Sequence, residues 1–240
     1  MPMEVHGSID RVDARLAGDQ LQVRVSDYKT GTKTFSLSDV LDGFNMQMFI
    51  YLLMLESAPR DRLRALAQET LGGAPEEIVP CAALYIPVKS PYVDASGGED
   101  VAALRQKAVR RFGLVRDDKA IVEALERREG DEFRFLPVKY LKNGSFSASS
   151  NVADERGIEL LLDKTRRNLR EIADAVADGD IETTPYEEGS GSSCDWCPYR
   201  EACQFDTTMN KDRYRYLRSF KDDQVLERLE EEASANAVHE

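Results

Sequence analysis

A carboxylate and a lysine stand two residues apart at the end of an apolar segment. Asp27 and Lys29 belong to the run Val25-Ser-Asp-Tyr-Lys-Thr-Gly31. Residues two apart on a β-strand share a face, so the sequence predicts that these two side chains lie together. An aspartate can hold a hard cation such as Mg²⁺ or Mn²⁺, and a lysine can neutralise charge that develops on a phosphate. The pair therefore suits metal-dependent phosphodiester hydrolysis.

A second carboxylate supports this interpretation. Asp-x-Lys alone also arises by chance in 240 residues with 44 acidic side chains, and an isolated copy is better explained as a structural ion pair. The segment from Gly7 to Asp13 predicts a strand, and Gln20 to Tyr28 predicts a second strand after a turn near Gly18. This hairpin would bring Asp10 beside Asp27.

Two further polar side chains follow on a predicted helix. The segment from Phe44 to Leu55 contains no Pro or Gly, and Gln47 and Tyr51 are spaced i, i+4, so they share one helical face. Periodicity alone favours a plain structural interpretation, with Gln47 as a polar interruption and Tyr51 as a core aromatic residue.

Three cysteines lie within ten residues near the end of the chain. Cys194, Cys197 and Cys203 follow the segment Gly189 to Ser193, and their spacing favours a metal over disulfides. From spacing alone, Zn²⁺, an iron–sulfur cluster and no metal all remain open. The fourth cysteine, Cys81, stands in an apolar strand and is predicted to be a small buried side chain.

Composition limits the possible classes of protein. The net charge of −12 argues against a simple DNA-binding module, because affinity for phosphate comes mainly from Lys and Arg. We recognise no signal peptide, and the longest apolar run, Met46 to Leu55, is too short to span a membrane. We therefore expect no membrane association and a cytoplasmic location.

The remaining elements are predicted from periodicity and turn residues. We expect a helix from Pro59 to Leu71, a buried strand from Ile78 to Val88 and a loop from Ser90 to Glu99. Two charged helices should follow, from Asp100 to Phe112 and from Asp117 to Arg128, and then an extended stretch from Phe133 to Leu141. The last elements are a long amphipathic helix from Val152 to Ala177, closed by Gly179, and a polar helix with a frayed tail from Lys221 to Glu240.

The ordered motifs resemble those of the RecB-type nucleases of the PD-(D/E)xK superfamily. The resemblance rests on four stretches: Gly7 to Asp13, Asp27-Tyr-Lys29, Gln47-x-x-x-Tyr51 and Cys194-x-x-Cys197-x5-Cys203. It extends to Tyr214–Leu217 and so covers nearly the whole chain. Within the superfamily, the chain is most similar to nuclease domains of bacterial helicase–nucleases.

The resemblance implies a role for each matching residue. Asp10 and Asp27 would bind the metal, with the backbone carbonyl of Tyr28 as a further ligand, and Lys29 would be the catalytic lysine. Gln47 and Tyr51 would support the site and contact DNA. Asp13 lies three residues after Asp10 and would point away from it on a strand, which suggests a supporting role. The cysteines Cys194, Cys197 and Cys203 would bind a [4Fe-4S] cluster.

The implied fold is α/β (α+β), a nuclease core with a central mixed sheet flanked by helices. We expect a nuclease domain over residues 1–206, with its core at about 3–90, a helical insertion at about 91–150, and a long helix with the cysteine segment at about 151–206. Residues 207–240 would form a C-terminal helical tail.

The implied activity is that of a metal-dependent DNA exonuclease that works on linear ends and single strands in the bacterial cytoplasm with a helicase–nuclease partner subunit. The family has a further helix upstream, with a His or Glu and the first of four cysteines. This chain begins six residues before Gly7, so we expect a piece of a larger protein that holds an incomplete cluster or none. Two alternatives stay open: a stand-alone iron–sulfur nuclease of the CRISPR-adaptation type, and a non-catalytic scaffold that binds DNA ends.

Overall fold

The predicted hairpin forms one side of a five-stranded sheet. The computed structural model describes residues 3–31, 35–58, 60–89, 92–94, 97–98, 100–128, 133–189, 191–209 and 213–237. Strands β1 (Arg11–Ala17) and β2 (Gln20–Lys29) pair antiparallel around a turn at Gly18, whose φ of +65° suits glycine. The predicted turn is therefore confirmed.

The sheet is mixed, as the sequence predicts. Its order is β1-β2-β3-β4-β5, where β3 is Glu77–Pro87, β4 is Phe112–Arg116 and β5 is Val152–Ala153. The pairs β2/β3 and β4/β5 are parallel, and β1/β2 and β3/β4 are antiparallel. A parallel neighbour requires a crossover, which here contains the helices α1 (Leu37–Leu41), α2 (Gln47–Glu56) and α3 (Arg60–Leu71).

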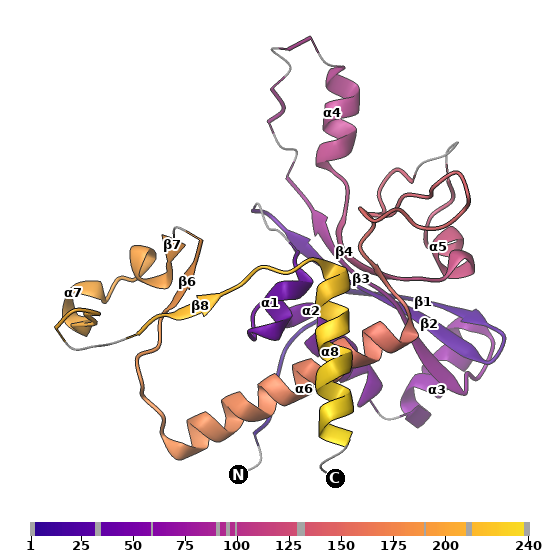
Figure 1. The fold of residues 1–240 in the computed structure, drawn as a ribbon. Helices are drawn as coiled ribbons and strands as arrows, with labels where there is room; N and C mark the ends of the chain where they lie inside the picture. The colour runs from indigo at the N-terminus through magenta and orange to yellow at the C-terminus, as the bar shows by residue number, and fades with distance from the viewer. Residues whose placement is uncertain are drawn as a thin grey trace.

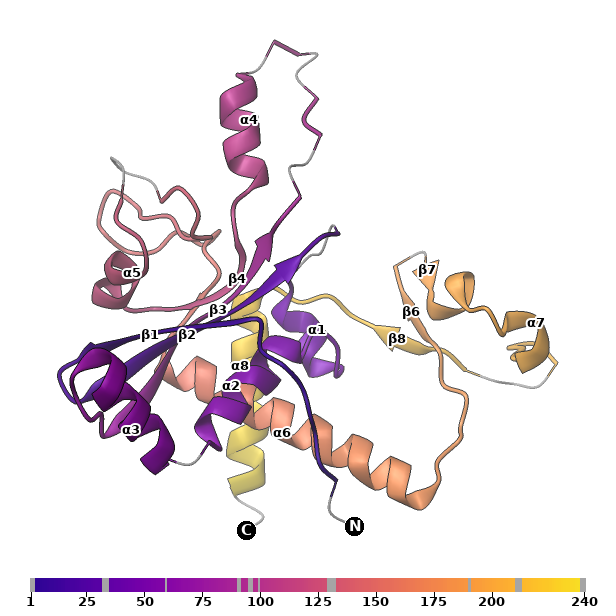
Figure 2. The same cartoon turned by 180° about the vertical axis from the view of Figure 1, so that it is seen from behind.

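Helices cover one face of the sheet and bury the main core. Helix α2 packs there with α1 and with the long helices α6 (Glu155–Asp178) and α8 (Asp222–Ala237), while α3 covers the hairpin end (Figures 1 and 2). The core joins residues of the strands β2, β3, β4 and β5 to residues of these helices, including Val25, Tyr85, Phe49, Leu161 and Leu229.

The opposite face carries the segment between β4 and β5. Helix α5 (Lys119–Leu125) packs Val122 against Leu84 and Val115 of the sheet, and residues of the following loop complete this second cluster. Helix α4 (Val101–Ala108) projects beyond the sheet (Figure 1).

Strand β4 corrects the prediction for this region. We expected a helix from Asp100 to Phe112, but α4 ends at Ala108, and Phe112 begins a strand that pairs with β3. The segment predicted as a helical insertion therefore also completes the main sheet. A strand of five residues that contains Gly113 is too short to show a clear period of two.

Other boundaries also differ from the prediction. Strand β1 begins at Arg11 and not at Gly7, and helix α2 begins at Gln47 and not at Phe44. The long helix was expected from Val152, yet α6 begins at Glu155 because Val152 and Ala153 pair with β4 and Asp154 caps the helix. Helix α5 is shorter at both ends than the predicted Asp117 to Arg128, since Asp118 is its N-cap and the backbone is extended at Glu126.

The C-terminal helix is part of the core. We expected a polar helix with a frayed tail, but α8 buries Val225 and Leu229 completely against the main core. Ser38 of α1 fixes the approach to this helix, since its Oγ donates to the carbonyl of Arg218 and accepts from the backbone N–H of Phe220. The two buried apolar positions are too few to stand out in an acidic segment.

The cysteines lie in a small unit that stands away from the main sheet (Figure 1). This unit, called the cysteine segment below, runs from Tyr186 to Leu217. It contains β6 (Tyr186–Glu188), β7 (Gly191–Ser192), a 3₁₀ turn (Ser193–Trp196), α7 (Arg200–Cys203) and β8 (Arg215–Leu217), with sheet order β7-β6-β8. Within the described ranges, we find no helix with the length and apolar character needed to cross a bilayer.

Candidate active site

Asp27 and Lys29 form a close ion pair at the end of β2. Lys29 Nζ lies 2.6 Å from Asp27 Oδ2, so the predicted shared face is confirmed. Asp27 is only 4% exposed, whereas the Lys29 side chain is 22% exposed. A buried carboxylate is costly unless it is paired, and Lys29 supplies the opposite charge.

Gln47 connects this pair to α2. Its Nε2 donates to Asp27 Oδ1 at 3.1 Å and to the Tyr51 hydroxyl at 2.8 Å, and its Oε1 accepts from Lys29 Nζ at 3.0 Å. The amide oxygen faces the cation and the amide nitrogen faces the carboxylate, which is the favourable orientation for both charges. The plain interpretation of Gln47 as a polar interruption is therefore wrong.

Asp10 reaches the same end of the sheet. The hairpin register ends with Arg11 opposite Ser26, and Asp10 directly precedes Arg11 as Asp27 directly follows Ser26. Asp10 Oδ2 accepts the backbone N–H of Tyr28 at 3.0 Å, and the residue is exposed. The hairpin thus brings an exposed carboxylate to the end of β2 where the buried one lies, as the sequence predicts.

Tyr85 is a neighbour that the sequence analysis missed. The parallel register places it opposite Asp27, and Lys29 Nζ lies 5.1 Å from the centroid of its ring. Burial, with added effects of Asp27 and Tyr51, raises the pKa of Tyr85 to about 12, so its hydroxyl is protonated at neutral pH. Sequence spacing carries no signal for this contact because it depends on the register between two distant strands.

The two carboxylates fit a hard divalent cation. Asp27 Oδ2 accepts no hydrogen bond from the described residues, although Lys29 lies close to it. No group of three or more His, Cys, Asp and Glu side chains in the described ranges is placed to hold a metal. Mg²⁺ is commonly held by one or two carboxylates while water and substrate phosphate supply its other ligands, so the chemistry of this donor set is compatible with such a cation.

Asp13 faces the other side of the hairpin. It pairs with Arg24 at 2.7 Å and with Arg11 at 2.8 Å. Burial would raise the pKa of Asp13, but hydrogen bonds and charges from both arginines outweigh it and hold that pKa below its usual value. Asp13 thus points away from Asp27, as its spacing from Asp10 predicts.

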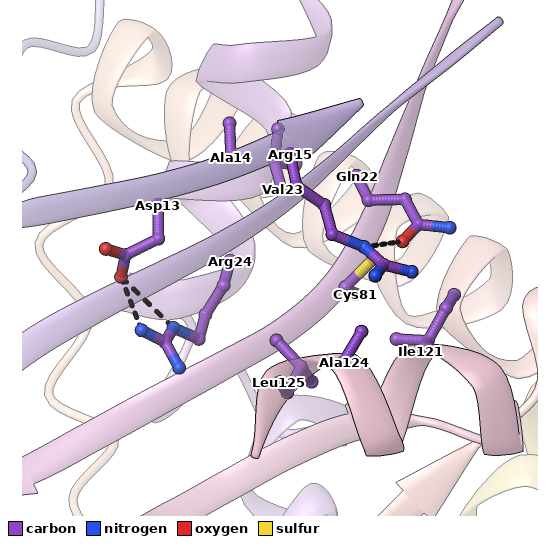
Figure 3. Close-up of a pocket in the computed structure, with 10 residues that line it drawn as sticks. All are labelled: Asp13, Ala14, Arg15, Gln22, Val23, Arg24, Cys81, Ile121, Ala124 and Leu125. Atoms are coloured by element: carbon purple, nitrogen blue, oxygen red, sulfur yellow. Dashed lines mark hydrogen bonds and ion pairs between the residues drawn. The ribbon is translucent and has the colours of Figure 1, made fainter. Parts of the chain in front are cut away.

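A pocket of about 170 Å³ lies on this opposite face (Figure 3). Asp13 and Arg24 are at one end, Cys81 of β3 lines it, and Ile121 and Leu125 of α5 close one side. Burial raises the pKa of the Cys81 thiol to about 11, which makes it a poor nucleophile at neutral pH. The prediction that Cys81 is a small buried side chain is confirmed.

The three other cysteines are separated along the cysteine segment. Cys194 lies in the 3₁₀ turn, Cys197 follows it, and Cys203 ends α7; the last two are exposed. A hydrogen bond with Cys194 raises the pKa of Tyr214. The described geometry does not gather the thiols into one metal-binding group, so it does not fit a cluster as it stands and we derive no chemistry from one.

Curated proteins whose shared name describes one subunit of an "ATP-dependent helicase/deoxyribonuclease" are similar to this chain. The protein from Clostridium tetani is 32% identical over 229 residues and that from Alkaliphilus oremlandii 30% over 230 residues, which cover 94% and 95% of the chain. The protein from Bacillus anthracis is 28% identical over 234 residues, or 96% of the chain. In each case the chain spans only 19% of the relative.

A family model gives a match that covers most of the chain. The model described as the PD-(D/E)XK nuclease superfamily matches residues 2–204, a range that contains the hairpin, α2 and the three cysteines. The mixed sheet with helices on both faces is consistent with the core of that family. The chain belongs to the PD-(D/E)XK nuclease superfamily.

Proposed function

We propose that this chain is the metal-dependent nuclease domain of an AddB-like helicase–nuclease subunit. It hydrolyses DNA phosphodiesters as an exonuclease during the processing of double-strand breaks for recombinational repair. The observation that carries the proposal is the hydrogen-bonded arrangement of Asp27, Lys29, Gln47 and Tyr51, with Asp10 beside it.

Asp10 and Asp27 would hold Mg²⁺ or Mn²⁺, together with the backbone carbonyl of Tyr28. When bound, the cation supplies charge that activates water and neutralises the phosphate. Lys29 contributes independently, because an ammonium has three N–H donors. One donates to Gln47 and a second lies against Asp27, which leaves one for the attacking water or a phosphate oxygen.

Gln47 fixes the direction of the Lys29 ammonium, and Tyr51 supports Gln47. A lysine side chain has four rotatable carbon–carbon bonds, so an unrestrained ammonium would occupy many positions. The contacts with Gln47 Oε1, Asp27 Oδ2 and the ring of Tyr85 restrict it before any substrate arrives. Such preorganisation is a main source of electrostatic catalysis.

The relatives' shared name supports the assignment to a helicase–nuclease. Since the chain spans 19% of their length, the motor would lie elsewhere, in the rest of the polypeptide and in an AddA-like partner subunit. These would deliver DNA to the nuclease site as a single strand in the bacterial cytoplasm.

The iron–sulfur assignment of Cys194, Cys197 and Cys203 stays a prediction. The resemblance implies a fourth ligand outside this chain, and the segment alone would then hold an incomplete [4Fe-4S] cluster or none. Stoichiometric iron with a stable absorption band near ~410 nm in the purified chain would contradict that expectation.

The nuclease proposal is tested by digestion of end-labelled linear DNA, single-stranded and double-stranded, with Mg²⁺ or Mn²⁺. We expect cleavage to require the cation and Lys29→Ala to lower the rate by about 10²-fold or more, because a preorganised charge is lost. Lys142→Ala, an exposed lysine in the loop after α5, is the matched control and should cleave normally.

The outcomes separate the alternatives. Full activity of Lys29→Ala would remove Lys29 from the mechanism. If this chain does not cleave but a longer polypeptide with the upstream helix does, the site needs that helix. If neither cleaves, a non-catalytic scaffold that binds DNA ends becomes the better assignment.

A further inference from the structure

The ring of Phe44 contacts both of the strands that frame the cysteine segment. Its centroid lies 5.0 Å from that of Tyr186 in an edge-on arrangement, and the guanidinium carbon of Arg215 lies 5.3 Å from its centroid. Strands β6 and β8 pair in parallel with Tyr186 directly opposite Arg215. One ring of the main domain is therefore held by residues from the two ends of the cysteine segment.

This ring connects the cysteine segment to the main domain. Figures 1 and 2 both show the segment standing away from the five-stranded sheet. The chain leaves it next to α1, where Ser38 binds the backbone of Arg218 and Phe220. Movement of the segment would therefore act first on α1 and on the loop that carries Phe44.

That loop leads directly into the candidate active site. The N–H of Phe44 donates to the carbonyl of Asp39 at 2.8 Å, and the side-chain amide of Asn45 donates to the Asp39 carboxylate. Asn45 has a φ of +50°, a left-handed conformation that only a few residue types adopt readily. Helix α2 begins immediately afterwards, with Gln47 as its first residue.

Gln47 is sensitive to the loop because of its place in the helix. The N–H groups of a first helical turn have no partner within the helix, so the preceding loop has a large part in holding this turn. The Gln47 amide must reach Lys29 at 3.0 Å and Asp27 at 3.1 Å at once. A shift of about 1 Å would weaken both hydrogen bonds, since such bonds fade beyond roughly 3.2 Å.

We propose that Phe44 is a positioning residue through which the cysteine segment sets the place of Gln47 beside Asp27 and Lys29. Tyr186 and Arg215 hold the ring, the ring holds the turn at Asn45, and the turn sets where α2 begins. The catalytic consequence rests on the nuclease activity proposed above; the structural linkage does not.

The first measurement is hydrogen–deuterium exchange of the full chain, with peptides that cover α2 and α3. We expect Phe44→Ala to speed exchange in the first turns of α2 and to leave α3 unchanged. Phe44→Tyr keeps the ring and should restore protection. Arg215→Gln should act in the same direction as Phe44→Ala but less strongly, because Arg215 is exposed.

Arg128→Gln is the matched control. The guanidinium carbon of Arg128 lies 5.2 Å from the centroid of the Tyr140 ring, on the other face of the sheet. It should leave exchange in α2 unchanged. If Phe44→Ala does not fold, Arg215→Gln decides the question, since a substitution of an exposed side chain preserves the core.

The second measurement is the rate of DNA cleavage. We expect Phe44→Ala to lower kcat by roughly 10- to 10²-fold with little change in KM, since misplacement by about 1 Å affects the reacting groups more than substrate binding. Phe44→Tyr should recover most of the rate.

The two measurements separate the two proposals. Unchanged exchange in α2 for Phe44→Ala and for Arg215→Gln would overturn the linkage, whatever the cleavage rates. If the wild-type chain cleaves no DNA but exchange responds as expected, the linkage stands and the nuclease proposal fails.

Discussion

Removal of the positive charge beside Asp27 tests whether the candidate site depends on a buried ion pair. We expect Lys29→Met to destabilise the folded chain, because Asp27 is 4% exposed and would lose the ammonium that lies 2.6 Å away. Methionine is unbranched and flexible, so it can fill most of the space of the lysine stem and packing losses stay small.

The expected loss follows from the burial of the pair. Removal of one partner from a buried ion pair costs about 3–5 kcal/mol. The Lys29 side chain is 22% exposed and Gln47 still donates to Asp27, so we expect the lower end, about 3 kcal/mol. For a chain of this size, 1 kcal/mol shifts Tm by roughly 2–4 °C, which predicts a fall of roughly 6–12 °C.

The assay is denaturant unfolding at neutral pH without divalent cations. It compares the wild type with Lys29→Met, Asp27→Asn and the double variant. The double variant carries neither charge and should recover most of the lost stability, with a coupling free energy of about 2 kcal/mol or more.

A surface pair provides the control. Arg156 and Glu230 lie 3.1 Å apart with side chains 51% and 50% exposed, so Arg156→Met should leave unfolding nearly unchanged. A loss below about 1 kcal/mol for Lys29→Met, or additive effects in the double variant, would refute the view that Asp27 is a desolvated charge held by Lys29.

Three further substitutions probe the surroundings of the site. Because the pKa of Tyr85 is raised to about 12 in the folded chain, its contribution to the free energy of unfolding is complete below about pH 10 and is lost as the pH rises to about 12. Tyr85→Phe should remove up to about 3 kcal/mol of this pH dependence, which is measured by unfolding across this pH range. Gly113→Ala should cost more than about 3 kcal/mol, since φ is +137° and a Cβ would lie 2.1 Å from the Ala83 carbonyl oxygen. Gly31→Ala is the control and should cost little, since apart from its chain neighbours no atom of the described residues lies within 4 Å of the added Cβ. Ser38→Ala should cost about 1–3 kcal/mol and speed hydrogen exchange in α8, because the carbonyl of Arg218 and the N–H of Phe220 both lose a partly buried hydrogen bond.

The parts of the site that the sequence predicts depend on short-range geometry. A period of two places Asp27 beside Lys29, and i, i+4 spacing places Gln47 beside Tyr51; the structure has both contacts. The hairpin is likewise local, because its two strands follow each other in the sequence and are joined by a short turn at Gly18. These arrangements follow from the backbone of one element or of two adjacent ones.

The missed parts depend on contacts between distant segments. Tyr85 reaches Lys29 only through the register of two parallel strands, and that register shifts at a bulge between Val23 and Arg24. Strand β4 was missed because five residues are too few to show a clear period of two. Its pairing depends on Gly113, since the backbone of β3 passes too close for a side chain there.

Phe44 shows why contacts between distant segments matter for the interpretation of substitutions. It belongs to none of the four motifs, and in the sequence it is only an apolar residue at the start of a predicted helix. Its contacts with Tyr186 and Arg215 exist because two short strands pair far along the chain. A comparison of motifs would therefore class Phe44→Ala as neutral, while the geometry predicts a loss of rate with substrate binding nearly intact. Such a loss would arise because Gln47 is displaced, and the motif Gln47-x-x-x-Tyr51 does not by itself determine where Gln47 lies.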